Sequence, residues 1–335
     1  MTTSKTWIDL TINSGAITYT GSNYCYCVVL KNITTNTFWS NIIDSSSISV
    51  YDRDTGLQRP KYVANLSIAD KNGFIFFDAP VNTTKKIRIY FGKSLSVINS
   101  TSAFVNDNYG NYWTMSELTG STIYDLCGSC NLDVNGATIN SAGTLFKSVS
   151  FNGVSGNLRN LACDPLGTND NTIGLITTVI GLGGSSVGRF WACDNHDINV
   201  RTLGRISFNN FSAGISSNSN NNLYTLSDVL NFDFTLKNNG DNVYYKNGSA
   251  FNSGANVGVV VPGTKFYVGS KNDGSLTFNG KIEHLTISKT IRSATYLATR
   301  HNMLINNSTF FTGYNTVYKK SLGGKLSLSL NLSMM

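Results

Sequence analysis

The segment from Arg189 to Asp197 carries the side chains best suited to bind a ligand, in the order Arg-Phe-Trp-Ala-Cys-Asp-Asn-His-Asp. A sugar site needs an aromatic ring against the C–H face of the sugar, and amides or carboxylates for its hydroxyls. The candidate glycan-binding residues are therefore Trp191, Asp194, Asn195, His196 and Asp197. The same oxygens could hold Ca²⁺, which prefers oxygen ligands. The alternative is a core tryptophan followed by a polar hairpin turn.

A second polar loop, running from Lys271 to Gly274, adds Asn272 and Asp273 to these candidates. Asn, Asp and Gly are also the residues that favour ordinary turns, because they tolerate the backbone angles that turns need. The loop therefore indicates either a plain turn or a further part of a ligand site.

Patterns that would carry catalysis are missing from the sequence. Retaining glycosidases need two carboxylates about 5–5.5 Å apart, but the only two glutamates, Glu117 and Glu283, belong to no such pattern. Asp52 and Asp54 are two residues apart, yet they lie in what we expect to be a glycine-ended turn. The glycine-rich run 181–188 contains the letters Gly-x-Ser-x-Gly at 184–188, but strand-like residues flank it, which indicates a hairpin loop rather than the strand-to-helix turn of a hydrolase. The run also lacks the Lys-Ser/Thr of a phosphate loop. We therefore expect a protein that is not an enzyme and needs no cofactor.

Six cysteines are present. Cys127 and Cys130 have a spacing found in metal and redox sites, but a zinc ribbon needs a second such pair, which the sequence lacks. We expect reduced structural thiols, which behave as small buried apolar residues. The alternative is a metal site or a disulfide, including one between Cys127 and Cys130.

Composition and charge narrow the class of protein. Charged residues make up 13% of the 335 residues, the formal net charge is +7, and the pI is about 9.0. The Lys and Arg residues are scattered rather than clustered with aromatic residues, so we expect no nucleic-acid partner.

No apolar run approaches the roughly 20 residues of a membrane helix, and the first residues do not resemble a signal peptide. We therefore expect neither membrane insertion nor export by the usual route.

Short alternating segments separated by turn residues predict an all-β protein. The run Lys86 to Gly92 alternates cleanly between polar and apolar residues. Asn247-Gly248 follows a strand-like segment, and Asn-Gly is a strong signal for a β-hairpin because both residues tolerate positive φ. Ser293 could cap a short helix over 294–303. Strands about 8 to 12 residues apart favour sandwiches or barrels.

The second half resembles the concanavalin A-like, laminin G-like (LamG) sandwich. The resemblance rests on segments that follow one another in the family's order: Tyr112-Trp-Thr-Met-Ser-Glu117, Tyr124-Asp125 with Gly128 and Asn131, Phe151-Asn-Gly153, Tyr244-Tyr-Lys-Asn-Gly248 and Phe278-Asn-Gly-Lys-Ile-Glu283. His284 departs from the family's acidic residue. These motifs shape turns and core, so the resemblance implies a fold rather than a site. We expect Phe151, Tyr244, Ile282, Leu285 and Ile287 in the core.

The first half resembles a β-domain family of unknown function. The similar segments are a Trp-containing first strand, the Val50-Tyr-Asp-Arg-Asp-Thr-Gly56 turn and the Lys86-Ile-Arg-Ile-Tyr-Phe-Gly92 strand. In that family a LamG-like module often follows directly, in prokaryotic surface proteins and phage structural proteins. The expected architecture is two β-sandwich, jelly-roll-like domains, over 1–108 and 109–305, followed by a C-terminal β tail, 306–335.

The tail ends in Lys325-Leu-Ser-Leu-Ser-Leu-Asn-Leu-Ser333, which puts four leucines on one face of a strand. An uncovered apolar strand is an aggregation hazard. We expect it to dock on a neighbouring subunit or another particle protein; the alternative is that it folds back on its own chain.

Together these expectations describe a virion structural protein, such as a phage fibre, spike or capsid decoration, assembled in the host cytoplasm. Its partners would be other virion proteins or its own copies in a homo-oligomer, with a host surface glycan as candidate ligand. The alternative is a carbohydrate-binding adhesin or lectin of a prokaryotic cell surface, and a glycoside hydrolase ranks third. The virion assignment rests on family resemblance.

Overall fold

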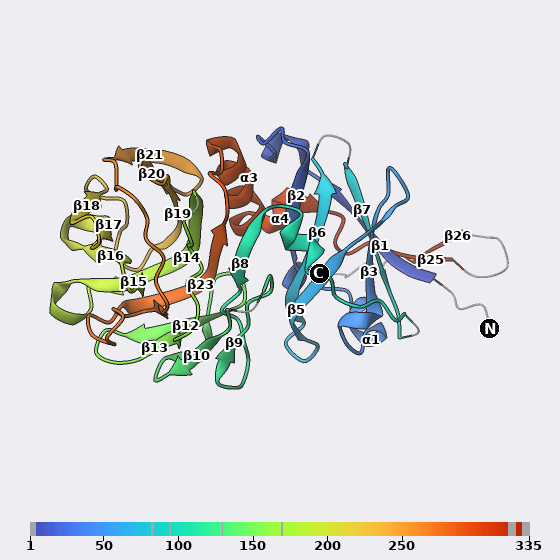
Figure 1. Ribbon diagram of the computed structural model, residues 1–335. Helices are drawn as coiled ribbons and strands as arrows, with labels where there is room; N and C mark the ends of the chain where they lie inside the picture. Colours follow the sequence, from blue (N-terminus) through green and yellow to red (C-terminus); the bar gives the residue numbers. More distant parts are fainter. Residues whose placement is uncertain are drawn as a thin grey trace. The chain divides into compact units, whose positions relative to one another are not determined.

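The computed structural model describes residues 5–81, 84–93, 95–128, 130–168, 170–320 and 326–329. The chain divides into two compact units (Figure 1). Unit 1 combines residues up to Asp107 with those from Thr299 onward, and unit 2 comprises Asn108–Ala298. Unit 1 is therefore discontinuous in sequence, and unit 2 is inserted within it.

Unit 1 contains two antiparallel sheets. The first has the strand order β26 (Leu326–Ser329), β25 (Val317–Lys320), β1 (Lys5–Ile12), β7 (Lys86–Phe91), β3 (Ile48–Asp52) and β4 (Gln58–Arg59), and β24 (Phe311–Thr312) also pairs with β1. The second has the order β2 (Asn23–Val29), β6 (Asn72–Pro80) and β5 (Lys61–Ser67). Successive side chains point to opposite faces of a strand, so Ile8 and Leu10 of β1 enter the core while Trp7 faces outward with Tyr90 and Tyr318.

Unit 2 is a sandwich of two larger antiparallel sheets. One has the order β18 (Ile215–Asn218), β17 (Arg205–Asn210), β16 (His196–Arg201), β15 (Gly188–Cys193), β22 (Phe266–Val268), β13 (Asn157–Asn160), β10 (Leu132–Asn135) and β9 (Thr122–Ile123). The other has the order β11 (Thr138–Ala142), β12 (Lys147–Asn152), β23 (Asn279–Ser288), β14 (Asn171–Gly181), β19 (Val229–Leu236), β20 (Asn242–Lys246) and β21 (Ser249–Gly254), and β8 (Tyr109–Trp113) also pairs with β23.

The all-β, sandwich-type fold expected from the alternation is confirmed. The predicted core residues of unit 2 are each no more than 2% exposed: Phe151, Tyr244, Ile282, Leu285 and Ile287. The Asn-Gly hairpin is also present, since Lys246 pairs with Ser249 across Asn247 (φ 52°) and Gly248 (φ 78°). The positive φ of both residues explains why this dipeptide was the strongest local signal.

Among the described residues the α-helices are short: α1 (Asn36–Asn41), α2 (Ser102–Val105), α3 (Ala294–Ile305) and α4 (Asn307–Phe310). Ser293 caps α3 as expected, because its hydroxyl accepts a hydrogen bond from the amide of Tyr296 at 3.2 Å. The boundary between the units falls inside α3, between Ala298 and Thr299. Within the described residues, no helix has the length and hydropathy needed to cross a lipid bilayer.

The C-terminal segment differs from the expected separate tail. β24 pairs with the end of β1, and β25 pairs with its beginning, so residues 311–320 complete the first sheet of unit 1. The predicted boundary at residue 305 is wrong for this reason: distant strand pairing outweighs proximity in sequence. β26 pairs with β25 of the same chain, which is the fold-back alternative. The rest of the predicted docking strand, in 321–325 and 330–335, lies outside the described residues.

The cysteines also correct an expectation. Cys130 and Cys163 form a disulfide with their Cα atoms 5.8 Å apart, so the expectation of reduced thiols is wrong for this pair. Cys127, the nearer candidate partner in sequence, is free. Cys27 and Cys193 are free and buried, and burial raises the pKa of the Cys193 thiol to about 12. Cys25 is also buried.

Candidate functional site

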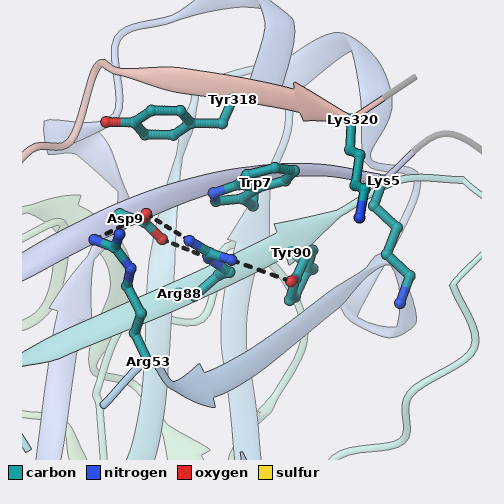
Figure 2. A pocket seen from close by; sticks show the side chains of 8 residues that line it. All are labelled: Lys5, Trp7, Asp9, Arg53, Arg88, Tyr90, Tyr318 and Lys320. Carbon is teal, nitrogen blue, oxygen red and sulfur yellow. Dashed lines mark hydrogen bonds and ion pairs between the residues drawn. The ribbon is translucent and has the colours of Figure 1, made fainter. Parts of the chain in front are cut away.

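A pocket of about 410 Å³ opens on the outward face of the first sheet of unit 1. Its walls come from β1, β7 and β25 and from the turn after β3 (Figure 2). The lining residues are Lys5, Trp7, Asp9, Arg53, Arg88, Tyr90, Tyr318 and Lys320. The three strands contribute alternate residues, as expected for side chains that share one face of a sheet.

Strand register brings these side chains together from distant parts of the chain. Trp7 lies between two cross-strand partners, Tyr90 on β7 and Tyr318 on β25. Two residues before Trp7 on the same face of β1, Lys5 is opposite Lys320. Directly opposed residues of an antiparallel pair have Cβ atoms about 4.5–5.5 Å apart, which is close enough for side-chain contact.

The aromatic rings form a continuous ladder across the sheet. Trp7 stacks on Tyr318 with ring centroids 5.7 Å apart and planes inclined by 13°. On the other side, the guanidinium carbon of Arg88 lies 4.6 Å from the Trp7 ring centroid. Tyr90 continues the ladder by an edge contact with Tyr51 at 5.2 Å. Trp7 is only 5% exposed as a result, and its ring faces are already occupied within the protein.

At one end of the pocket, a single carboxylate pairs with two arginines. Asp9 accepts two hydrogen bonds from Arg88, at 2.7 Å from Nε and 2.8 Å from Nη2, in the bidentate geometry that gives strong Arg–carboxylate pairs. Arg53 Nη1 lies 3.4 Å from the same carboxylate. The hydrogen bonds to Asp9 raise the pKa of Arg88 above its ordinary value. This end is therefore rigid and permanently charged.

The other end carries uncompensated positive charge. Lys5 and Lys320 extend together beyond the Trp7 ring, opposite the end occupied by Asp9 and Arg53 (Figure 2). Both lysines are exposed, and among the described residues neither contacts a carboxylate. Lys5 Nζ lies 5.7 Å from the Tyr90 ring centroid. With four basic side chains and one acidic one, the pocket favours anionic ligands.

The structure places Trp191 in the core of unit 2, which corrects its assignment as a sugar platform. It is 1% exposed, and its ring centroid lies 5.9 Å from that of Phe266. Its cross-strand partners are Ile198 and Val268, which are themselves buried. A ring enclosed in this way has no face for a ligand.

The polar residues that follow Trp191 do not converge on one site. Asp194 accepts hydrogen bonds from Thr264, at 2.7 Å from the amide and 2.8 Å from the hydroxyl. Asn195 donates to the carbonyls of Val261 and Pro262. These contacts tie one loop to another, and they use the oxygens and amides that would have met a sugar.

His196 and Asp197 are both fully buried. Desolvation lowers the pKa of His196 to about 4, so its imidazole is neutral near pH 7. Asp197 forms an ion pair with Arg189. Neither side chain is available at the surface, so the segment Arg189–Asp197 is mainly structural.

Asn272 and Asp273 lie in an exposed turn. Hydrogen bonds from Ser275 lower the pKa of Asp273 to about 2. The carboxylate thus stabilises its own turn. As for Ca²⁺, the described part of the chain contains no group of three or more His, Cys, Asp or Glu side chains placed to hold a metal ion.

The unit 1 pocket was missed at the sequence level, although it left a signal. In both β1 and β7 the outward positions carry aromatic and basic residues, as in Trp7 and Arg88, where an ordinary solvent face would be polar. Tyr318 and Lys320 follow the same pattern more than two hundred residues later in the chain. Only the pairing of β1 with both β7 and β25 shows that these residues form one surface.

Neither a protein-family model nor a curated protein matches this sequence. Solved structures resemble it at low sequence identity. A Trypanosoma rangeli sialidase bound to sialic acid is 12% identical, with a TM-score of 0.47, over 75% of this chain and 45% of that one. The binding domain of Paraclostridial Mosquitocidal Protein 1 is 14% identical, with a TM-score of 0.48, over 59% and 52%. The botulinum neurotoxin serotype D binding domain is 11% identical, with a TM-score of 0.46, over 59% and 52%.

The chain thus spans about half the length of these similar structures. The comparison corrects one expectation, that the protein is not an enzyme, because sialidases are enzymes and several are among the similar structures. At these identities the likeness concerns the β-rich fold alone.

Proposed function

We propose that this protein binds glycans, and that the unit 1 pocket takes an acidic sugar. The observation that carries the proposal is the pair Lys5 and Lys320, two exposed ammonium groups without a carboxylate partner in the described structure, beside a rigid aromatic wall. A ligand carboxylate would form charge-assisted hydrogen bonds with them. The tyrosine hydroxyls of the same pocket can meet sugar hydroxyls.

The aromatic ladder disfavours a nucleic-acid ligand. Single-stranded nucleic acids bind by stacking bases on open aromatic faces. Here Tyr318 covers one face of Trp7 and the Arg88 guanidinium covers the other. A ligand therefore meets ring edges, hydroxyl groups and ammonium groups, a surface that suits a small carboxylated sugar better than a base.

Binding to a panel of carboxylated and neutral oligosaccharides would test this proposal. Replacing Lys320 with alanine should weaken binding of carboxylated glycans about tenfold, since a hydrogen bond to a charged group contributes about 1.5–3 kcal/mol. Lys319→Ala is the matched control, because Lys319 is also exposed but points to the other side of β25. The proposal fails if neutral glycans bind equally well, or if only single-stranded nucleic acid binds.

We also propose the setting in which this binding would operate, a virion component such as a fibre, spike or capsid decoration that meets a host glycan. What supports it is the order of sequence segments that resembles paired β-modules of phage and prokaryotic surface proteins. The partners would then be virion proteins or further copies of this chain. Mass spectrometry of purified particles would test it, and finding the protein on a cell surface instead would favour the adhesin alternative.

A further inference from the structure

A cluster of three arginines lies on the outward face of the first sheet of unit 2. Arg201 on β16 is directly opposite Arg205 on β17, so the two side chains leave the same face as neighbours. Arg189 on β15 is opposite Asn199, which is two residues before Arg201 on that face. Ile198 and Val200 alternate with Asn199 and Arg201 along β16, point inward and belong to the core.

This arrangement carries more positive charge than the protein itself compensates. Arg189 Nε contacts Asp197 Oδ2 as an ion pair without good hydrogen-bond geometry, and Arg189 Nη1 is buried with no hydrogen-bond partner among the described residues. Arg201 Nε donates to Asn199 Oδ1 at 2.8 Å, and Arg205 Nε is buried without a partner. Across the described residues, Asp197 is the single carboxylate in ion-pair contact with the three.

Like charges placed directly opposite each other destabilise an antiparallel pair. Burial adds to this cost, because a lower dielectric strengthens repulsion between guanidinium groups. Desolvation, together with the charges of Arg189 and Arg205, lowers the pKa of Arg201. A sheet that keeps Arg201 opposite Arg205 gains stability when an anion is bound between them.

Polar neighbours hold the cluster in position. Asp197 Oδ1 accepts hydrogen bonds from Asn199 at 2.7 Å and from Asn209 at 2.6 Å, and Ser216 donates to Asn209 at 2.7 Å. These contacts order the side chains beside the arginines. Arg189 is 7% exposed, whereas Arg201 and Arg205 are half-buried, so a ligand would reach the latter two from the surface.

We propose that Arg201 and Arg205 bind a tetrahedral oxyanion, a sulfate or phosphate, with Arg189 contributing positive charge beneath them. Guanidinium groups present donors in a planar fork that matches such oxygens. The site is separate from the unit 1 pocket, and the anion could be free or part of an ester on a glycan.

Sulfate titration of the full chain tests the proposal. It is done in a Lys5→Ala/Lys320→Ala background, so that any binding arises outside the pocket of the proposed function. Calorimetry at constant ionic strength should show saturable binding of inorganic sulfate or phosphate. Arg205→Gln should weaken it at least tenfold. Arg159→Gln is the matched control, since Arg159 shares this sheet face but lies on β13, beyond β22.

The stability of the same variants separates ligand binding from a structural role. Without sulfate, Arg205→Gln should melt no lower than its parent, because like-charge repulsion is relieved. Added sulfate should raise the melting temperature of the parent and leave that of the variant unchanged. If the variant binds sulfate as tightly as the parent, or if the parent binds neither anion, the proposal is wrong. The affinities for inorganic sulfate and for a sulfated disaccharide are then compared. Tighter binding of inorganic sulfate indicates a free anion as the ligand, and tighter binding of the disaccharide indicates a sulfate ester on a glycan.

Discussion

The unit 1 pocket and the unit 2 arginine cluster occupy equivalent positions, the outward face of an antiparallel sheet, but they differ in how charge is arranged. In the pocket, Asp9 pairs with both arginines, and the lysines extend into solvent. In the cluster, one buried carboxylate, Asp197, serves three arginines that are themselves partly or fully buried.

The difference shows that the neighbours of a basic side chain decide its role. Lys5 and Lys320 are exposed, and a lysine side chain is flexible and well hydrated. Their charges therefore destabilise the free protein little, and the side chains can adjust to a ligand. Arg189 cannot move away from its surroundings, so its charge must be offset where it lies. The pocket should therefore depend on charge for binding, and the cluster should depend on charge for stability as well.

Removing the carboxylate from each site should give the largest contrast. Asp197→Ala leaves Arg189 buried and unpaired, and we expect it to lower the free energy of unfolding by about 3–5 kcal/mol. Asp9→Ala should cost only about 1–2 kcal/mol, because Arg88 and Arg53 can turn toward water. Hydrogen exchange measured peptide by peptide would assign each loss to its unit. Equal losses would remove the distinction between the two sites.

Reduction of the disulfide should affect only the unit that contains the arginine cluster. Cys130 and Cys163 are 33 residues apart, and opening a loop of that length costs roughly 3–4 kcal/mol of stability in the chain-entropy model. Amides of unit 2 should therefore exchange faster in reductant, while those of unit 1 stay unchanged. Cys163→Ser should show the same exchange with and without reductant. Faster exchange in unit 1 would contradict the prediction.

Acid should weaken unit 2 through a buried histidine. Desolvation lowers the pKa of His196 to about 4 in the folded protein, whereas an unfolded histidine titrates near 6.5. Between these values the unfolded state binds more protons, so stability falls as the pH falls from about 6.5 to 4. His196→Gln should flatten this part of the stability profile by up to about 3 kcal/mol. His301 in unit 1 also has a lowered pKa, so His301→Gln should flatten the profile in the same direction, but in unit 1. Hydrogen exchange measured peptide by peptide separates the two contributions. An unchanged profile for His196→Gln would count against the prediction.

The effect of salt concentration on ligand binding should be the smallest of these effects. Its measurement compares the two sites directly. Exposed charges are screened more than buried ones. Raising sodium chloride from about 0.05 to 0.5 M should therefore weaken glycan binding at Lys5 and Lys320 several-fold, with less effect on sulfate binding at Arg201 and Arg205. Titrations at both salt concentrations would measure the two dependences. A steeper salt dependence for sulfate binding than for glycan binding would contradict this prediction.

Local sequence signals predicted the fold well and the site poorly. The Asn247-Gly248 hairpin and the core face of β23 depend on backbone angles and alternation, which are local properties. The unit 1 pocket depends on pairing among residues near positions 7, 90 and 318, which no local pattern encodes. The prediction that Trp191 contacts a ligand was wrong because the strand register shifts between Arg189 and Trp191. Simple alternation would place these two side chains on the same face of β15, but they lie on opposite faces.

The discontinuous build of unit 1 affects how the protein is made on the ribosome. Strand β1 emerges first, but β24 and β25, which pair with it, emerge only after the whole of unit 2. During translation, β1 would expose an unpaired edge while unit 2 can already fold as a contiguous segment. Tyr318 and Lys320 are among the last pocket residues to be synthesised. Chains that end between residues 298 and 317 would thus carry a complete unit 2 but lack Tyr318 and Lys320 of the unit 1 pocket.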